Sequence, residues 1–472
     1  MIRPRHQRNL YDSISSQIIE DHDKLGWEEW MKQADALLDD EELVEMAQER
    51  LQRRRPHSRV RGREGTPAEV VLRMLALKHI RNWSFETLER EVRPNLIYRE
   101  FTRIRDRKVP DAKTMIRIRQ ALGGETLQKT NERLVALAIE RKVMRGRKMR
   151  VDTTAVETNV HYPTDSSLLG DGVRTITRLV SRTNKELGEK AIKVRNRMRS
   201  VKRRLIDIAK SGRARGEAFK ERQAKSYRKL LATTKRVVKE AKTVVRQAES
   251  GLKKKGESVK RVALRKVSAE LARVIEVTEK VVAQTKARIV DGDTHYEGKL
   301  ASIFEPCTEV IRRGKAGKPT EFGKMAKIQE AENQIITSYE VYDRRPADSD
   351  LLIPAIEKHE EIFDRVPELA AADAGFYSAD NITKATEAGV NRVSVPNKKP
   401  GSKATRKKQK QRWFKDGQRW RVGCEGRISV LKRRHGMNRS RYRGIDGIRC
   451  WVGLAVFADN LINIGKALAR AR

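Results

Sequence analysis

Three carboxylates lie in segments that could bring them to one place: Asp152, Asp373 and Glu425. Asp152 is part of RKMRVDTTAVE, an alternating run rich in β-branched and small residues, and this pattern predicts a strand. Asp373 ends a second short strand of small residues, ELAAAD, and Ala374 and Gly375 after it leave room for a ligand. Glu425 belongs to a predicted helix, QRWRVGCEGRISVLKRRHG. Two strands and a helix can bring three acids together in one cluster.

An acidic cluster repels itself unless cations occupy it. Mg²⁺ prefers oxygen ligands, usually a few carboxylates together with water and phosphate oxygens of the substrate. Two such ions, about 4 Å apart, activate a water or a 3′-hydroxyl and stabilise the leaving oxygen in an in-line displacement at phosphorus. The cluster therefore predicts a Mg²⁺ enzyme, with Mn²⁺ as the other candidate metal, that cuts or joins nucleic acid.

Cations accompany the third acid on its predicted helix. Arg421 precedes Glu425 by four residues and Lys432 follows it by seven, so all three lie near one helical face. With Arg433 and Arg434, these cations are the predicted contacts to DNA phosphates. Each acid also has a simpler interpretation, because Asp152 could cap a strand, Asp373 could open a turn and Glu425 could be solvated.

The overall charge of the chain indicates the partner. The 472 residues carry a formal net charge of +41, and 38% of them are hydrophobic. A field of this sign suits DNA or RNA; a basic protein without catalysis and an anionic membrane surface are the alternatives. No apolar run approaches the roughly 20 residues that span a bilayer, and the N-terminus lacks a signal sequence, so we expect a soluble, cytoplasmic protein. The three cysteines are scattered and support neither a disulfide framework nor a zinc knuckle.

The N-terminal part reads as helical. Residues 1–55 form a predicted helical arm, and residues 56–145 form a predicted all-α domain that opens with Thr66 as an N-cap and Pro67 at the first helical position. A late basic helix of this domain carries Arg117 and Arg119, as in a helix-turn-helix-like DNA-binding unit. A helical dimerisation module explains the pattern equally well.

Residues 175–290 have a different character. Hydrophobic residues recur every seven positions, which predicts three long helices in a coiled-coil-like insertion with basic outer faces. These faces favour contact with a DNA backbone over a merely solvated surface. The preceding passage, 160–178, has turn signals, so Asp165 and Asp171 are expected as loop or capping residues.

The remainder, residues 146–174 and 291–472, is expected to form one α/β domain around the acids. It contains predicted strands near Ile328 and over 335–341, and a basic, flexible loop over 397–412. The final apolar segment, broken by Asp459 and Asn460, is expected to be a buried core helix.

Four passages together resemble a bacterial insertion-sequence transposase of the DDE type, near the IS5-like and ISNCY-like groups. They are GTPAEVVLRMLALKHIRNWSFETLEREV, VDTTAVETNVHYPTDSSLL, AADAGFYSADN and RVGCEGRISVLKRRHG. The third motif of that family often reads Tyr, two residues, Arg, three residues, Glu, six residues, Lys. Arg421, Glu425 and Lys432 match this spacing, whereas Gln418 occupies the tyrosine position.

The resemblance implies an RNase H-like catalytic domain with the first acid on the opening strand, the second on a later strand and the third on a helix. By position, Asp152, Asp373 and Glu425 are the implied catalytic and metal-binding residues. The implied activity is metal-dependent cleavage and strand transfer at terminal inverted repeats, with double-stranded end and target DNA as partners. A homodimer or higher oligomer, associated with the nucleoid of a bacterial cell, is expected. The alternatives are a non-catalytic, basic architectural DNA-binding protein or transposase remnant, and a two-metal nuclease without strand transfer.

Overall fold

The computed structural model describes residues 5, 27–53, 65–188, 191–192, 194–211, 216–252, 259–293, 295–312 and 319–470. The chain divides into two compact units. The first, here the sheet unit, comprises residues 1–159 and 313–472, and the second, here the helical bundle, comprises residues 160–312. Each unit is described by itself. The mixed α/β architecture agrees with the fold class expected from the sequence.

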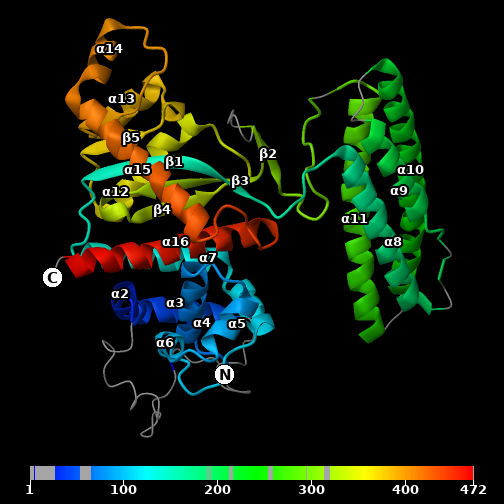
Figure 1. Ribbon diagram of the computed structural model, residues 1–472, viewed down its shortest axis with the longest axis horizontal. Coiled ribbons are helices and arrows are strands. Elements are labelled where there is room, and N and C mark those ends of the chain that lie inside the picture. Colours follow the sequence, from blue (N-terminus) through cyan, green and yellow to red (C-terminus); the bar gives the residue numbers. More distant parts are fainter. Residues whose placement is uncertain are drawn as a thin grey trace. The chain divides into compact units, whose positions relative to one another are not determined.

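Five of the six strands of the sheet belong to the sheet unit, where they pair in the order β4-β3-β1-β5-β6 (Figure 1 labels β1, β3, β4 and β5). Strand β1 is antiparallel to β3 and parallel to β5, β3 is antiparallel to β4, and β5 is parallel to β6. The predicted strands near Ile328 and over 335–341 are confirmed as β3 and β4. The bounds are β1 Lys148–Glu157, β3 Thr320–Glu330, β4 Ile336–Val341, β5 Leu369–Ala372 and β6 Arg392–Ser394.

Successive residues of β1 point to opposite faces of the sheet. Met149 and Val151 enter a core with α12 (Leu352–Phe363) and α13 (Ala379–Glu387). Arg150 and Asp152 lie on the other face, which α15 (Arg412–Arg434) covers (Figure 1). The alternation therefore separates an apolar face from a face that carries charge.

The basic segment expected as a flexible loop contains a helix, α14 (Lys403–Lys410). Ser402 caps it, because its hydroxyl accepts a hydrogen bond from the Thr405 amide at 3.1 Å. The cap satisfies one of the amides that a helix start leaves open, and this explains why so basic a sequence is helical. The described part of the sheet unit also contains three short 3₁₀ turns: η3 Glu332–Gln334, η4 Asp348–Leu351 and η5 Ala374–Phe376.

The last helix, α16 (Gly444–Arg470), is a central core element of the sheet unit. It is the helix in the described residues that is long and apolar enough to cross a membrane, but 72% of its most apolar window is buried inside the protein. The prediction of a core helix is confirmed, although Asp459 and Asn460 do not break it. Asn460 exchanges two 2.9 Å hydrogen bonds with the backbone of Ile336 on β4, so a polar side chain inside the helix attaches it to the sheet.

Three of the N-terminal helices, α2, α4 and α7, pack on α16, and the whole group belongs to the same compact unit as the sheet. They are α2 Glu29–Leu38, α3 Glu41–Arg53, α4 Ala68–Ile80, α5 Phe85–Val92, α6 Leu96–Phe101 and α7 Ala112–Glu140. Helices α2 and α3 lie within residues 1–55, which were predicted as a helical arm. Helix α4 begins one residue later than predicted, with Pro67 rather than Thr66 at the N-cap. Helix α7 kinks at Gly123, where φ is +73°.

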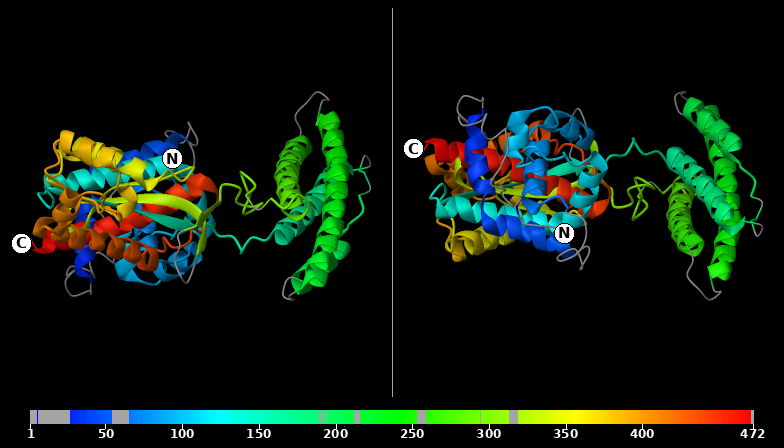
Figure 2. Two further views of the ribbon diagram at one scale, coloured as in Figure 1. Left: turned by 90° about the horizontal axis from the view of Figure 1, so that it is seen from above. Right: turned by 90° about the horizontal axis from the view of Figure 1, so that it is seen from below.

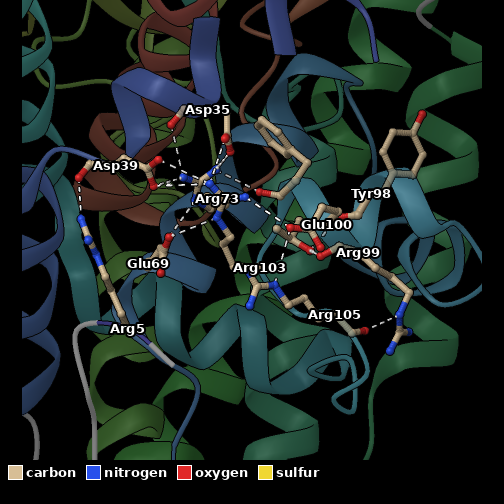
Figure 3. A network of polar contacts seen from close by, with 12 residues as sticks. Arg5, Asp35, Asp39, Glu69, Arg73, Tyr98, Arg99, Glu100, Arg103 and Arg105 are labelled. Atoms are coloured by element: carbon tan, nitrogen blue, oxygen red, sulfur yellow. Dashed lines mark hydrogen bonds and ion pairs between the residues drawn. The ribbon is translucent and has the colours of Figure 1, made fainter. Parts of the chain in front are cut away.

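A buried arginine joins three of these helices (Figure 3). The guanidinium of Arg73 on α4 is fully buried and contacts Asp35 at 2.5 Å, Asp39 at 2.8 Å and Glu69 at 3.3 Å. It also donates a 3.0 Å hydrogen bond to the carbonyl of Phe101 at the end of α6. A buried cation is tolerated only when it is paired and hydrogen-bonded, so this network fixes α2 and α6 against α4.

The described residues of the helical bundle form four helices, which lie side by side in both views of Figure 2. They are α8 Asp165–Leu187, α9 Met198–Ser211, α10 Glu217–Leu252 and α11 Val259–Ile289, followed by strand β2 Glu309–Arg312. Their core is made of valine, leucine and isoleucine.

The heptad pattern predicted three helices and missed α8, because the turn signals of residues 160–178, most of which lie inside this helix, were interpreted as a loop. Thr164 caps α8 in a capping box with Ser167. Asp165 is therefore inside the first turn and pairs with Arg288 at 2.5 Å, while Asp171 lies within the helix and pairs with Arg174. The expectation of loop or capping roles for these two aspartates is wrong.

Candidate active site at the ends of β1 and β5

Two of the three acids meet at neighbouring strand ends. Val151 on β1 is in register with Ala372, the last residue of β5, so Asp152 and Asp373 are the next positions on two parallel strands. Adjacent strands lie about 4.8 Å apart. Asp152 is half-buried, and its carboxylate accepts a 2.7 Å hydrogen bond from the amide of Thr153. Asp373 is exposed and caps the η5 turn by accepting from the amide of Ala374.

The helix with the third acid is attached to β1 by a buried ion pair. Arg150 lies two residues before Asp152 on the same face of the strand, and Glu330 is its partner in the register with β3. The Arg150 guanidinium donates two 2.9 Å hydrogen bonds to the fully buried Glu330 carboxylate and a third to the carbonyl of Trp420 on α15. Burial raises the pKa of Glu330, while Arg150 and Arg427 oppose the rise.

Two further residues of α15 show how closely this helix lies on the sheet. A Cβ at Gly423 would come within 2.2 Å of Arg150 Nη1, so only glycine leaves space for the guanidinium. Gln418 donates a 2.6 Å hydrogen bond to the carbonyl of Ser394 on β6 and a 3.3 Å one to Ala372, next to Asp373. The glutamine at the position where the related family often has tyrosine therefore ties α15 to the end of β5.

These contacts place α15 over the Asp152 face. Cys424 on α15 is buried, which raises the pKa of its thiol, and the carboxylates of Glu330 and Asp152 raise it further. The next residue, Glu425, is 56% exposed and accepts a 2.8 Å hydrogen bond from Arg421 Nη1. Arg421 is itself largely buried, and its Nε has no hydrogen-bond partner among the described residues.

The donor chemistry of this site suits a hard divalent cation, because all three predicted ligands are carboxylates. The geometry brings together two of them. In the part of the chain that the structure describes, no group of three or more His, Cys, Asp or Glu side chains is arranged to hold a metal ion. Asp152 and Asp373 lie at adjoining positions, whereas Glu425 is engaged by Arg421.

The predicted phosphate-binding cations lie in two places. Lys432, Arg433 and Arg434 form the last turn of α15, where both arginines are exposed and Lys432 is half-buried. Arg117 is exposed on α7, but Arg119 is buried, with its guanidinium 3.8 Å from the centre of the Tyr442 ring. Arg119 therefore stabilises the packing of α7 and does not present its charge to solvent.

The same ring faces another buried cation. Lys78 on α4 is 2% exposed and lies over the rings of Phe85, Tyr442 and Trp451 at 4.8–5.6 Å. Burial lowers the pKa of Lys78 to about 7, and the charges of Arg441 and Arg119 lower it further, against a smaller opposing effect of Glu86. Cation–π contacts of this kind partly replace lost hydration.

Sequence reasoning missed the residues that support the site. Arg150 and Glu330 were not singled out, although both follow from strand patterning: a charged residue two positions before Asp152 shares its face. Asp348 on η4 was also missed; it accepts a 2.9 Å hydrogen bond from Thr153 Oγ1, on the opposite face of β1 from Asp152. No local signal identifies Asp348, because its partner lies 195 residues away.

Two family models match the chain. One, described as Transposase domain (DUF772), matches residues 22–121, and the other, described as Transposase DDE domain, matches residues 383–464. No curated protein and no solved structure shows a significant match.

The two matched regions cover the N-terminal helices and the C-terminal part of the chain. The first spans α2 to α6 and the start of α7, with Arg117 and Arg119; the second spans most of α13 through α16, with Arg421, Glu425 and Lys432. Asp152 and Asp373 lie outside both. The two matches agree with each other and with the sequence motifs, and together they support a DNA transposase of the DDE type.

Proposed function

We propose that the chain is a transposase of the IS5-like or ISNCY-like groups that cleaves DNA at terminal inverted repeats and transfers the freed strand to target DNA. One observation carries the proposal: the register of β1 and β5 makes Asp152 and Asp373 neighbours, beneath a helix that bears Glu425. The opening strand, a later adjoining strand and a helix are the positions that an RNase H-like catalytic domain assigns to its three acids. The match of a DDE domain to residues 383–464 supports the assignment of the third.

Asp152, Asp373 and Glu425 would hold Mg²⁺ or Mn²⁺, with Glu425 exchanging its contact with Arg421 for the metal. Bound there, divalent ions supply activation of the attacking oxygen and stabilisation of the leaving oxygen. Within the protein, Arg150, Gly423 and Gln418 hold α15 so that Glu425 is near the strand ends. The largely buried Arg421 would bind a substrate phosphate once Glu425 is released from it.

The reaction has two displacements at phosphorus. Water attacks a phosphodiester at the end of the element, and the bond to the departing 3′ oxygen breaks. That 3′-hydroxyl then attacks a phosphodiester of the target, joins to its phosphorus and displaces the target's own 3′ oxygen. Because two ends react, at least a dimer is expected on DNA, with the N-terminal helices and the helical bundle binding the inverted repeats and Lys432, Arg433, Arg434 and Arg117 contacting phosphates.

The test is Asp152→Asn in the full chain, with Asp380→Asn on the exposed surface of α13 as the matched loss of one aspartate charge. We expect Asp152→Asn to abolish Mg²⁺-dependent nicking of a labelled inverted-repeat duplex while leaving end binding largely intact. Asp380→Asn should nick normally. Unchanged nicking by Asp152→Asn would refute its catalytic role.

The same assay separates the other functions. Nicks with Mg²⁺ and none with EDTA indicate an enzyme, and no nicks from the wild type under either condition would indicate an architectural DNA-binding protein. Joined products in addition to nicks indicate strand transfer, and their absence would indicate a nuclease.

A further inference from the structure

One face of helix α10 in the helical bundle is lined by cations. Lys225, Arg228, Lys235, Lys239, Lys242 and Arg246, here the cationic face, are separated by three, seven, four, three and four residues and are all exposed. Such spacing keeps side chains on one side of an α-helix. The buried residues of α10, among them Leu230, Thr234 and Val244, follow the opposite side and enter the bundle core.

The charge of this face is largely uncompensated. Between Arg222 and Arg246 the sequence has nine lysines and arginines and a single acid, Glu240. Glu240 is bound by Arg197 of the loop before α9, at 2.6 Å. Lys242 pairs with Glu279 of α11, and within the described residues none of the other five members of the cationic face has an ion pair.

Folding does not explain such a face. Like charges three or four residues apart destabilise a helix by about 0.2–0.5 kcal/mol for each pair. The apolar core on the other side of α10 already accounts for the packing of the bundle. A row of cations that costs stability, and of which only Lys242 has an ion pair within the described residues, indicates an anionic ligand.

The dimensions of the face indicate which anion. Lys225 and Arg246 lie 21 positions apart along the helix, so the face spans about 32 Å at 1.5 Å per residue. One turn of duplex DNA is about 34–36 Å. Single-stranded nucleic acid is usually bound on exposed aromatic side chains, but the aromatic residue in this stretch, Tyr227, is buried. The face therefore suits the backbone of a duplex.

We propose that the cationic face of α10 binds the sugar–phosphate backbone of duplex DNA over about one helical turn, without reading base sequence. The inference deepens the proposed transposase function and rests on it for the identity of the nucleic acid. It gives the helical bundle a part in binding the inverted repeats, through their sugar–phosphate backbone, and leaves recognition of their base sequence to other parts of the chain.

The test compares two triple variants of the full chain that lose the same charge. Arg228→Gln, Lys235→Gln and Lys239→Gln remove the centre of the cationic face. The control, Lys129→Gln, Lys220→Gln and Lys280→Gln, removes three exposed lysines that are paired with Glu125, Glu217 and Glu276. Affinity is measured between about 50 and 200 mM salt for an inverted-repeat duplex and a scrambled duplex of the same length.

Each phosphate contact contributes about 0.9 to the slope of log K against log salt concentration. The triple variant of the cationic face should therefore lower the slope by about 2.7 for both duplexes, with an unchanged ratio between their affinities. The control should keep the wild-type slope. An equal slope in both variants, or a loss confined to the inverted-repeat duplex, would overturn the inference.

The result that would refute the proposed function differs from the result that would refute this inference. If the wild type binds duplexes with the full salt slope but never nicks them with Mg²⁺, the transposase proposal is refuted and the cationic face stands. If the face variant nicks saturating DNA at low salt as the wild type does, its defect is in binding, as proposed. Far-UV circular dichroism on both variants verifies that these exposed substitutions leave the helices intact.

Discussion

The sheet unit and the helical bundle differ in the kinds of polar group that they bury. The sheet unit buries full charges: Arg150 with Glu330, Arg427 with Asp459, and Arg73 with Asp35. The bundle also buries an ion-paired carboxylate, Asp165 with Arg288, but its core contains mainly aliphatic side chains and hydroxyls, and four threonine hydroxyls bond to carbonyls of their own helices. These are Thr183 to Leu179, Thr234 to Leu230, Thr278 to Val274 and Thr285 to Val281.

The difference follows from how accurately each unit has to position its elements relative to one another. A buried ion pair is stable only with near-ideal geometry, so it determines how one element lies on another. In the sheet unit that geometry sets the position of α15, and so of Glu425, against β1. A hydroxyl bonded within its own helix fixes nothing between helices, and a charged outer surface needs only to present cations to a polyanion. We therefore expect substitutions of polar groups to destabilise the sheet unit more than they destabilise the bundle.

The largest loss of unfolding free energy is expected for Arg150→Met, which leaves the Glu330 carboxylate buried without its main partner. Breaking a buried pair in this way costs about 3–5 kcal/mol. Tryptophan fluorescence during urea unfolding measures it for the sheet unit alone, because all six tryptophans of the chain are in that unit.

The double variant Arg150→Met with Glu330→Leu is the control, since it removes both charges and should be less destabilised than the single variant. If Arg150→Met costs under about 1 kcal/mol, a value typical of surface pairs, then the comparison between the units fails.

A smaller effect is expected from Gly423→Ala. Its new methyl group would lie 2.2 Å from Arg150 Nη1 and 2.9 Å from Arg150 Cζ, so α15 or the guanidinium must shift. Overpacking of this kind costs about 1–3 kcal/mol, and Mg²⁺-dependent nicking should fall with it because Glu425 moves with the helix.

Gly426→Ala, three residues along the same helix, is the matched control. No atom lies within 4 Å of a Cβ at Gly426, and alanine in place of a helical glycine stabilises by about 0.5–1 kcal/mol. Equal nicking by the two variants would show that the contact between Arg150 and α15 does not position the site.

The elements that carry the acids were predictable because their signals are local. Alternation identified β1, small residues identified β5, and helical spacing placed Arg421, Glu425 and Lys432 on α15. The resemblance to transposases strengthened the choice of these acids among 63 aspartates and glutamates. Composition and periodicity alone left each of the three acids with a simpler interpretation.

What the sequence did not predict depends on contacts between distant residues. The pairing of Arg150 with Glu330 spans 180 positions. The inclusion of the N-terminal helices in the sheet unit depends on the packing of α16, near the other end of the chain. Helix α8 was missed for a different reason, because a capping box and two helical glycines resemble a turn when read one residue at a time.

The smallest effect should be in the bundle, from Glu240→Gln. Arg197 binds Glu240 through two hydrogen bonds of 2.6 and 2.7 Å, a geometry as good as that of Arg150 with Glu330, but both side chains are partly exposed. Solvent screening limits the stability that such pairs contribute to about 0.2–1 kcal/mol.

The control is Glu249→Gln on the same helix, which removes the same charge from an exposed residue with no ion pair in the described part of the bundle. Circular dichroism at 222 nm, set against the tryptophan signal of the sheet unit, isolates the unfolding of the bundle. A cost for Glu240→Gln as large as that for Arg150→Met would mean that geometry, and not burial, separates the two units.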